Sequence, residues 1–291
     1  MRVALAAGAP IVSCCIDGHE WCTAGAWLDY APTASACALP AFVADAPRSV
    51  FPEGGLLAAD VPAIDVRAEG GAPSITAVWP SSAYPLVWNR AIVLDGGGAV
   101  RLTYAVTNTH RAPLPFVWGL RIPLEWSAAI MLELPRAARA RVAAAHGTGL
   151  PRAGSEFVWP SLRDGGKLVD LTHPSRIDAR RAVLCYVELS RGRFALRSAS
   201  ALLEIAGDTG VVSHAHVWVN NDTDIERKAP RRWWRPFAQE QTLAVGPAVG
   251  APGTLSDAVG TWNTARWIDP GDTIQWQIHC RPVALSPSPN S

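Results

Sequence analysis

The stretch that decides the fold runs from Leu86 to Trp126 and reads LVWNRAIVLDGGGAVRLTYAVTNTHRAPLPFVWGLRIPLEW. It contains three short apolar runs separated by a glycine cluster and a polar turn. The runs are Arg90–Asp95, Val100–Thr107 and Phe116–Ile122, and the separators are Gly96–Gly98 and Asn108–Pro113. Each run has the length of an ordinary strand, and turns of this kind join neighbouring strands. The stretch therefore predicts three β-strands in a meander.

The rest of the 291-residue chain repeats this pattern. Its 24 glycines and 24 prolines are spread throughout and divide the sequence into short apolar runs. Further runs lie at Ile75–Val78, Ala182–Leu189, Ala201–Ile205, Val211–Val219, Gln241–Val245 and Thr273–His279. Many short strands joined by turns are typical of an all-β protein, so we expect one large antiparallel β-sandwich. We place the domain at residues 1–283, followed by a flexible Pro/Ser-rich tail at 284–291.

Helix signals are few. The segment Leu134–Ala145 has a helix-favouring composition, but Pro135 and a poor apolar face weaken a helix there. The segment Ser256–Trp262 could form a short helical turn with Ser256 as its N-cap.

Composition limits the classes of partner. Charged residues make up 18% of the chain and the net charge is +1, which argues against nucleic acid or an anionic membrane as the main partner. No apolar run reaches the roughly 18 residues that a membrane helix needs. We expect a cytoplasmic protein that is a monomer or a dimer. Ile11–Cys14 could instead be a lipoprotein cleavage box, but Gly8 and Pro10 break the apolar stretch before it, which favours a first core strand.

The six cysteines do not form a recognisable framework. Cys14, Cys15, His19 and Cys22 are close in sequence and could suggest zinc, but Cys14 and Cys15 are adjacent and would point to opposite faces of a strand. The chain also lacks a C-x-x-C pair. We therefore expect buried, reduced cysteines, no metal site and no cofactor.

Several motifs resemble the galactose mutarotase-like (aldose 1-epimerase) superfamily. Leu102–Asn108 (LTYAVTN) is similar to the family strand L-x-Y-x-V-x-N, and Pro115–Leu120 (PFVWGL) to the start of P-F-x-W-G-x-H-P. His216–Asn220 (HVWVN) resembles G-x-W-x-N, and Trp267–Trp276 resembles x-L-x-P-G-E-x-x-x-W. The likeness is scattered over nearly the whole chain and implies the mutarotase-type supersandwich. Within it, Leu134–Ala145 would be a strand.

The resemblance also implies a chemistry whose usual residues are absent from the expected positions of this chain. The family interconverts sugar anomers with a glutamate base and a histidine acid, helped by a second histidine. The acid falls on Arg121, which stays protonated and presents donors only. The base falls on Gly246, and the second histidine falls near Ala58–Pro62, which has none. We therefore expect the standard epimerase reaction to be lost.

Other residues could replace the missing groups. His214 and His216 are two apart on a predicted strand and so share a face, an arrangement used for metal binding or proton transfer. Glu240 and Asp222 could supply a carboxylate. The alternative for each is an ordinary hydrogen-bonded or surface residue, and the histidines lack a clear third ligand in sequence.

The thirteen tryptophans are the other unusual feature, because aromatic rings stack on the C–H faces of sugars. We predict a saccharide site in which Arg121 orients the ligand. Arg90 and Asn108 are scaffold or site residues, and Trp118, Trp218 and Trp233 are candidate aromatic contacts. Core packing is the alternative for Trp118. The expected function is binding of a mono- or oligosaccharide. An active isomerase with replacement groups, or a protein-interaction module, are the alternatives.

Overall fold

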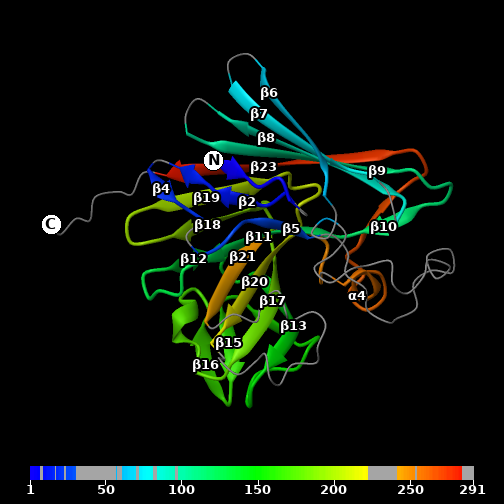
Figure 1. The fold of residues 1–291 in the computed structure, drawn as a ribbon. Helices are drawn as coiled ribbons and strands as arrows, with labels where there is room; N and C mark the ends of the chain where they lie inside the picture. Colours follow the sequence, from blue (N-terminus) through cyan, green and yellow to red (C-terminus); the bar gives the residue numbers. More distant parts are fainter. Residues whose placement is uncertain are drawn as a thin grey trace.

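The computed structural model describes residues 1–6, 9–16, 18–22, 24–30, 57, 61–69, 72–80, 84–95, 98–221, 241–252 and 254–283. The predictions for Trp233, Glu240, Asp222 and the tail at 284–291 lie outside these residues. Within them, two large antiparallel sheets form a sandwich, which confirms the expected all-β class (Figure 1).

One sheet has seven strands in the order β14-β13-β17-β20-β21-β11-β5. Neighbours in this sheet are antiparallel throughout. The strands are β5 (Leu28–Tyr30), β11 (Trp118–Leu124), β13 (Arg139–His146), β14 (Glu156–Val158), β17 (Ala182–Glu188), β20 (His214–Asn220) and β21 (Thr242–Val249).

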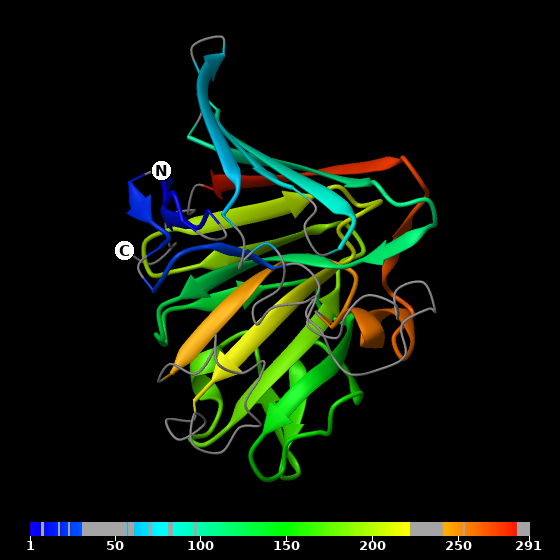
Figure 2. The same cartoon turned by 45° about the vertical axis from the view of Figure 1, so that its right-hand side comes forward.

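The other sheet has eight strands in the order β12-β18-β19-β23-β9-β8-β7-β6. The strands are β6 (Ala63–Glu69), β7 (Ala72–Trp79), β8 (Leu86–Leu94), β9 (Val100–Asn108), β12 (Met131–Glu133), β18 (Arg193–Arg197), β19 (Leu202–Gly207) and β23 (Thr273–Val283). Figure 2 shows the β6–β7 end of this sheet projecting beyond the rest of the sandwich.

Smaller elements complete the described chain. Four two-stranded pairs are formed by β1 (Arg2–Val3) with β2 (Ile11–Ser13), β3 (Cys15–Ile16) with β4 (His19–Glu20), β10 (Leu114–Phe116) with β22 (Arg266–Ile268), and β15 (Ser161–Asp164) with β16 (Lys167–Asp170). A 3₁₀ turn, η1, covers Pro174–Arg176, and a short helix, α4, covers Leu255–Val259. The segment Ile11–Ser13 is thus a strand, as the core-strand interpretation expected.

The core lies between the two sheets because each central strand turns an apolar stripe inward. In β8 and β9, buried and partly exposed residues alternate. Trp276 of β23 is at the centre of an aromatic cluster, with its ring 5.3 Å from those of Tyr104 and Trp118 and 6.0 Å from that of Phe116. Such ring pairs add about 1 kcal/mol each to the burial of their surfaces.

The expected three-stranded meander is wrong at its third strand. β8 and β9 pair as predicted, but the second neighbour of β9 is β23. The third apolar run divides into β10, which pairs with β22, and β11, which enters the seven-stranded sheet. β11 is buried on both faces except at Arg121, which suits its place between β21 and β5 in the second sheet better than the edge of a hairpin.

Two local predictions are also resolved. The segment at 134–145 contains no helix: residues 134–138 form a turn, and the rest belongs to strand β13, in which alternate residues are buried as in a half-exposed strand. The helical turn near Ser256 is present as α4, but its N-cap is Thr254 and Ser256 lies within the helix.

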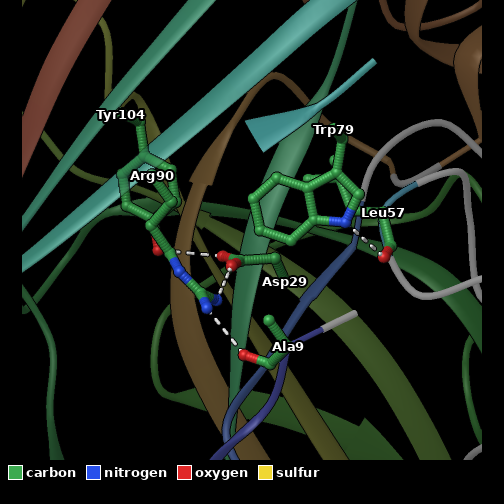
Figure 3. A network of polar contacts seen from close by, with 6 residues as sticks. All are labelled: Ala9, Asp29, Leu57, Trp79, Arg90 and Tyr104. Atoms are coloured by element: carbon green, nitrogen blue, oxygen red, sulfur yellow. Dashed lines mark hydrogen bonds and ion pairs between the residues drawn. The ribbon is translucent and has the colours of Figure 1, made fainter. Parts of the chain in front are cut away.

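A buried ion pair joins the two sheets (Figure 3). Arg90 of β8 donates to the Asp29 carboxylate of β5 at 2.5 Å and to the Ala9 carbonyl at 2.6 Å. The Tyr104 hydroxyl of β9 donates to the other Asp29 oxygen at 2.8 Å. The Arg90 guanidinium also lies 5.3 Å from the centre of the Trp79 ring. The carboxylate is therefore satisfied from two strands of the opposite sheet.

Candidate functional site

Arg121 and Gly246, the positions where the resemblance places the acid and the base, stand opposite each other in the seven-stranded sheet. The pairs Gly119–Ala248 and Ile122–Val245 share one register, which sets Arg121 of β11 across from Gly246 of β21. Two positions that are far apart in sequence thus meet in one cross-strand row.

The row continues across the sheet. Gly246 faces His216 of β20, His216 faces Tyr186 of β17, and Tyr186 faces Arg141 of β13. Because directly opposite residues point to the same face, these five positions share one side of the sheet. We call Arg121, Gly246, His216, Tyr186 and Arg141 the site row.

The site row lies on the face turned away from the eight-stranded sheet. The alternate residues of the same strands, such as Leu120, Val217 and Val245, belong to the core between the sheets. The face that carries the site row has its own apolar cluster, which includes Tyr186, Trp218, Ala244 and Ala248. His216 and Trp218 are buried, whereas Arg121 keeps part of its surface exposed. A ligand would therefore meet Arg121 before it met the imidazole.

Gly246 is a glycine because the backbone leaves no room for a side chain. A Cβ built there would collide with the carbonyl oxygen of Leu120 on β11, and it would come within 2.9 Å of the His216 Cε1 atom. Real Cβ atoms essentially never approach other atoms this closely. The imidazole of His216 thus borders the space that a side chain at position 246 would enter.

The charges in the site row favour hydrogen bonding over proton transfer. Burial and, to a smaller extent, the positive charge of Arg121 together lower the pKa of His216 from 6.5 to about 3. Burial also lowers the pKa of Arg121. At neutral pH the imidazole is therefore uncharged, and the guanidinium remains a donor because arginine holds its proton far above neutrality.

A second row on the same face contains the other histidine. His214 faces Glu188 of β17, and Glu188 accepts a hydrogen bond from Arg139 of β13 at 2.8 Å. The His214 Nδ1 atom lies 2.8 Å from the Ser213 hydroxyl oxygen. The pKa of His214 is lowered to about 4 by burial, with Glu188 opposing and Arg139 reinforcing the shift. The two histidines therefore share a face, as the spacing predicted.

Trp262 lies over the far end of the site row. Its ring is 4.4 Å from the Arg141 guanidinium carbon and 5.9 Å from the Tyr186 ring. Arg141 also donates through Nε to the Gly154 carbonyl. A partly exposed indole beside a guanidinium is a surface that can contact the apolar face of a sugar.

Three of the predicted binding residues are placed elsewhere. Arg90 belongs to the buried ion pair between the sheets. Asn108 closes the turn after β9, since its side-chain nitrogen donates to the Ala112 and Ile268 carbonyls and its oxygen accepts from the His110 amide. Trp118 packs in the inter-sheet aromatic cluster. These contacts account for all three as scaffold, so we leave them out of the site.

The remaining described candidates come together. Arg121, His214, His216 and Trp218 all lie on the face of the site row, although Trp218 is fully buried. Sequence reasoning did not single out Tyr186, Arg141 or Trp262. Tyr186 lies in an ordinary apolar run and Arg141 in a segment of uncertain type, so the cross-strand register was needed to place them.

Two further features bear on the site. Within the described ranges, no group of three or more His, Cys, Asp or Glu residues is placed to hold a metal ion. The described helices include none that is long and apolar enough to cross a membrane.

Searches by sequence find no matching family model and no matching curated protein. Solved structures do match. A galactose mutarotase-like protein from Lactobacillus casei superposes with a TM-score of 0.58 at 16% identity, covering 97% of this chain and 96% of that one. A galactose mutarotase related enzyme from Lactobacillus acidophilus gives 0.55 at 12% identity, with 96% and 92% covered. Slr1438 from Synechocystis gives 0.51 at 12% identity, with 75% of this chain and 65% of its own length covered.

These likenesses define the class of protein by its fold. The chain has the galactose mutarotase-like fold, in agreement with the resemblance that the sequence motifs carry. At such low identity the comparison concerns architecture alone, so the function has to be argued from the residues of the site.

Proposed function

We propose that this protein binds a mono- or oligosaccharide on the site-row face without catalysing the interconversion of sugar anomers. The observation that carries the proposal is the pairing of Arg121 with Gly246 in one cross-strand row. The resemblance assigns a proton donor and a proton acceptor to these positions, and here they hold a guanidinium and a bare backbone.

The loss of catalysis follows from the protonation states. Ring opening needs a base on the anomeric hydroxyl and an acid on the ring oxygen, each with a pKa near the working pH. Arg121 cannot release its proton at neutral pH, and the low pKa of His216 leaves it without a proton to give as an imidazolium. Gly246 has no titratable group.

Binding does not need these proton transfers. Arg121 offers several N–H donors from a partly exposed position, which suits sugar hydroxyls. At the other end of the site row, Trp262 and Arg141 offer an aromatic ring and further donors. Aromatic faces with a few placed donors are the usual elements of saccharide recognition.

The test is calorimetric titration of the full chain with galactose, glucose, their 6-phosphates and short oligosaccharides. We expect at least one of these ligands to bind, and Arg121→Ala to weaken that binding by about tenfold or more, since hydrogen bonds to charged groups contribute roughly 1.5–3 kcal/mol. The matched control is Arg281→Ala, because Arg281 is an exposed arginine of the eight-stranded sheet that pairs with Glu204. If none of the sugars binds, or if both variants act alike, the proposal fails.

An active isomerase is the second candidate, and one cross-strand pairing favours it. Glu188 faces His214 across two neighbouring strands, so a carboxylate and an imidazole do stand together on this face. The ion pair of Glu188 with Arg139 and the low pKa of His214 count against a catalytic role. A polarimetric assay on the same sugars decides, and we expect no acceleration above the solvent rate. Turnover that Glu188→Gln or His214→Ala abolishes would establish the isomerase instead.

A further inference from the structure

Strand β6 forms one edge of the eight-stranded sheet. Among the described residues its only strand partner is β7, with which it pairs over all seven of its residues without a register shift. Figures 1 and 2 show β6 on the outside of the projecting end of the sheet, and no described strand lies beyond it. A regular edge strand presents a row of backbone N–H and C=O groups that another strand can pair with.

Strand β6 has charged residues, which can weaken edge pairing, but it has no bulge against β7. Its sequence, AIDVRAE, has none of the prolines or lysines with which proteins usually block edge pairing. Val66 at the middle of the strand is 67% exposed, although valine is a residue that strands normally pack. An exposed apolar residue at the centre of a regular edge favours a partner strand there.

The two charges of β6 are arranged symmetrically about Val66. Asp65 and Arg67 are two apart on the same face, 2.5 Å from each other, and both side chains are more than half exposed. In a two-fold symmetric antiparallel pair, each residue faces one of the same pleat direction on the other copy, so only every second register is allowed. The neighbouring allowed registers would set Asp65 against Asp65 or Arg67 against Arg67.

We infer that β6 pairs with β6 of a second copy of this chain, antiparallel and centred on Val66. That register is the one that pairs all seven residues of the strand, and it places each Asp65 opposite an Arg67 of the other copy. The two Val66 side chains then meet at the two-fold axis. Full backbone pairing and matched charges thus select the same alignment, and the two eight-stranded sheets become one continuous sheet.

The dimer is independent of the proposed saccharide site. The site row lies on the seven-stranded sheet, and β6 is the far edge of the other sheet. We therefore expect Arg121→Ala to leave the dimer unchanged, and the charge changes in β6 to leave saccharide binding unchanged. Failure of one proposal would not imply failure of the other.

The experiment is sedimentation equilibrium of the full chain over a concentration series from micromolar to several hundred micromolar. We expect a reversible monomer–dimer equilibrium, because a single-strand interface is smaller than a standard one. Asp65→Arg places an arginine opposite each Arg67, and Arg67→Asp has the mirrored effect. Each should weaken the dimer by about tenfold, since two cross-strand charge pairs change sign. The double exchange Asp65→Arg with Arg67→Asp restores opposite charges and should restore the dimer.

Arg281→Asp provides the charge-matched control, because Arg281 is also more than half exposed on the same sheet but lies on β23, away from the edge. It should not change the dimer. Thermal unfolding of all variants shows whether they fold. A chain that stays monomeric at every concentration overturns the inference. So does a dimer that the single changes leave intact, a double exchange that does not recover it, or assembly beyond two copies.

Discussion

Asp29 and Arg90 form the most deeply buried ion pair in the described part of the chain, with both side chains at most 1% exposed. Such a pair gives little net stability over an apolar pair, but losing one partner leaves a buried charge uncompensated. We predict that Asp29→Asn lowers the free energy of unfolding by about 3 kcal/mol in urea denaturation. The control is Glu133→Gln, which removes the partly exposed pair with Arg197 and should cost about 0.5 kcal/mol. Equal losses in the two variants would contradict this reading of the pair.

His216 makes the stability of the protein depend on pH in a defined direction. Its pKa in the folded state, about 3, is lower than the 6.5 of an unperturbed histidine, so below pH 6.5 the unfolded chain takes up a proton that the folded chain does not. The stability that the protein owes to its neutral His216 is fully present above pH 6.5 and is lost progressively as the pH falls toward 3. Between pH 6.5 and about pH 3, the free energy of unfolding falls by about 1.4 kcal/mol for each pH unit.

The corresponding measurement is urea unfolding between pH 7 and pH 4. In His216→Gln, stability should fall less steeply with acid, by about 1.4 kcal/mol per pH unit relative to the parent chain. The change in slope is the readout, since the substitution itself also alters stability. His19→Gln is the control, because His19 lies on the short strand β4 away from this face. An unchanged slope in His216→Gln would show that the imidazole titrates normally.

At the scale of elements, Gly246 fixes how closely β11 and β21 approach. We predict that Gly246→Ala destabilises the fold by roughly 3 kcal/mol, because the new Cβ would meet the Leu120 carbonyl and the backbone would have to move. Restoring a glutamate at this position should be at least as damaging and should not produce epimerase activity. Gly210→Ala is the matched control, since a Cβ there meets nothing within 4 Å. It should change the free energy of unfolding by no more than about 0.5 kcal/mol.

The strands also show which parts of the fold can be predicted from the sequence alone. Short apolar runs between turn residues located most of the longer strands of the two sheets; β7, β17, β19 and β23, for example, overlap predicted runs. Pairing was harder, because β11 is as apolar as a meander strand yet pairs with β21, more than a hundred residues later. Residues 134–145 were ambiguous because alanine and arginine favour helices locally, whereas pairing with β17 makes the part that belongs to β13 a strand.

The candidate site also has a part that the sequence predicts and a part that it does not. The resemblance to family motifs indicated Arg121 and Gly246, and the two-residue spacing placed His214 and His216 on one face of a strand. The structural roles of Arg90 and Asn108 could not be derived, because they depend on Asp29 and on the carbonyls of residues distant in sequence. Tyr186 and Trp262 likewise enter the site only through cross-strand register and loop position.

At the scale of the whole molecule, the two sheets share one continuous core. Buried residues from nearly every strand of both sheets belong to a single apolar cluster, and the Asp29–Arg90 pair links strands of opposite sheets inside it. Either sheet alone would expose the apolar residues of its inner face to water. A chain of this length could hold two units that unfold separately, but a shared core couples the sheets.

We therefore predict that the sandwich unfolds in one cooperative transition. Tryptophan fluorescence reports on the thirteen tryptophans together, which include the inter-sheet residues Trp88, Trp118 and Trp276. The Trp276 ring lies 6.3 Å from that of Trp88 and 5.3 Å from that of Trp118. Far-ultraviolet circular dichroism reports on the strands. The two urea curves should coincide. Trp276→Leu should shift both by the same amount, with a loss of about 2–3 kcal/mol, because the cavity opens between the sheets. Trp267→Leu, at a position 45% exposed on β22, is the matched control and should shift neither curve by more than about 0.5 kcal/mol. Separate midpoints for the two signals, or a Trp276→Leu shift in fluorescence alone, would mean that the sheets unfold independently and that the shared core does not couple them.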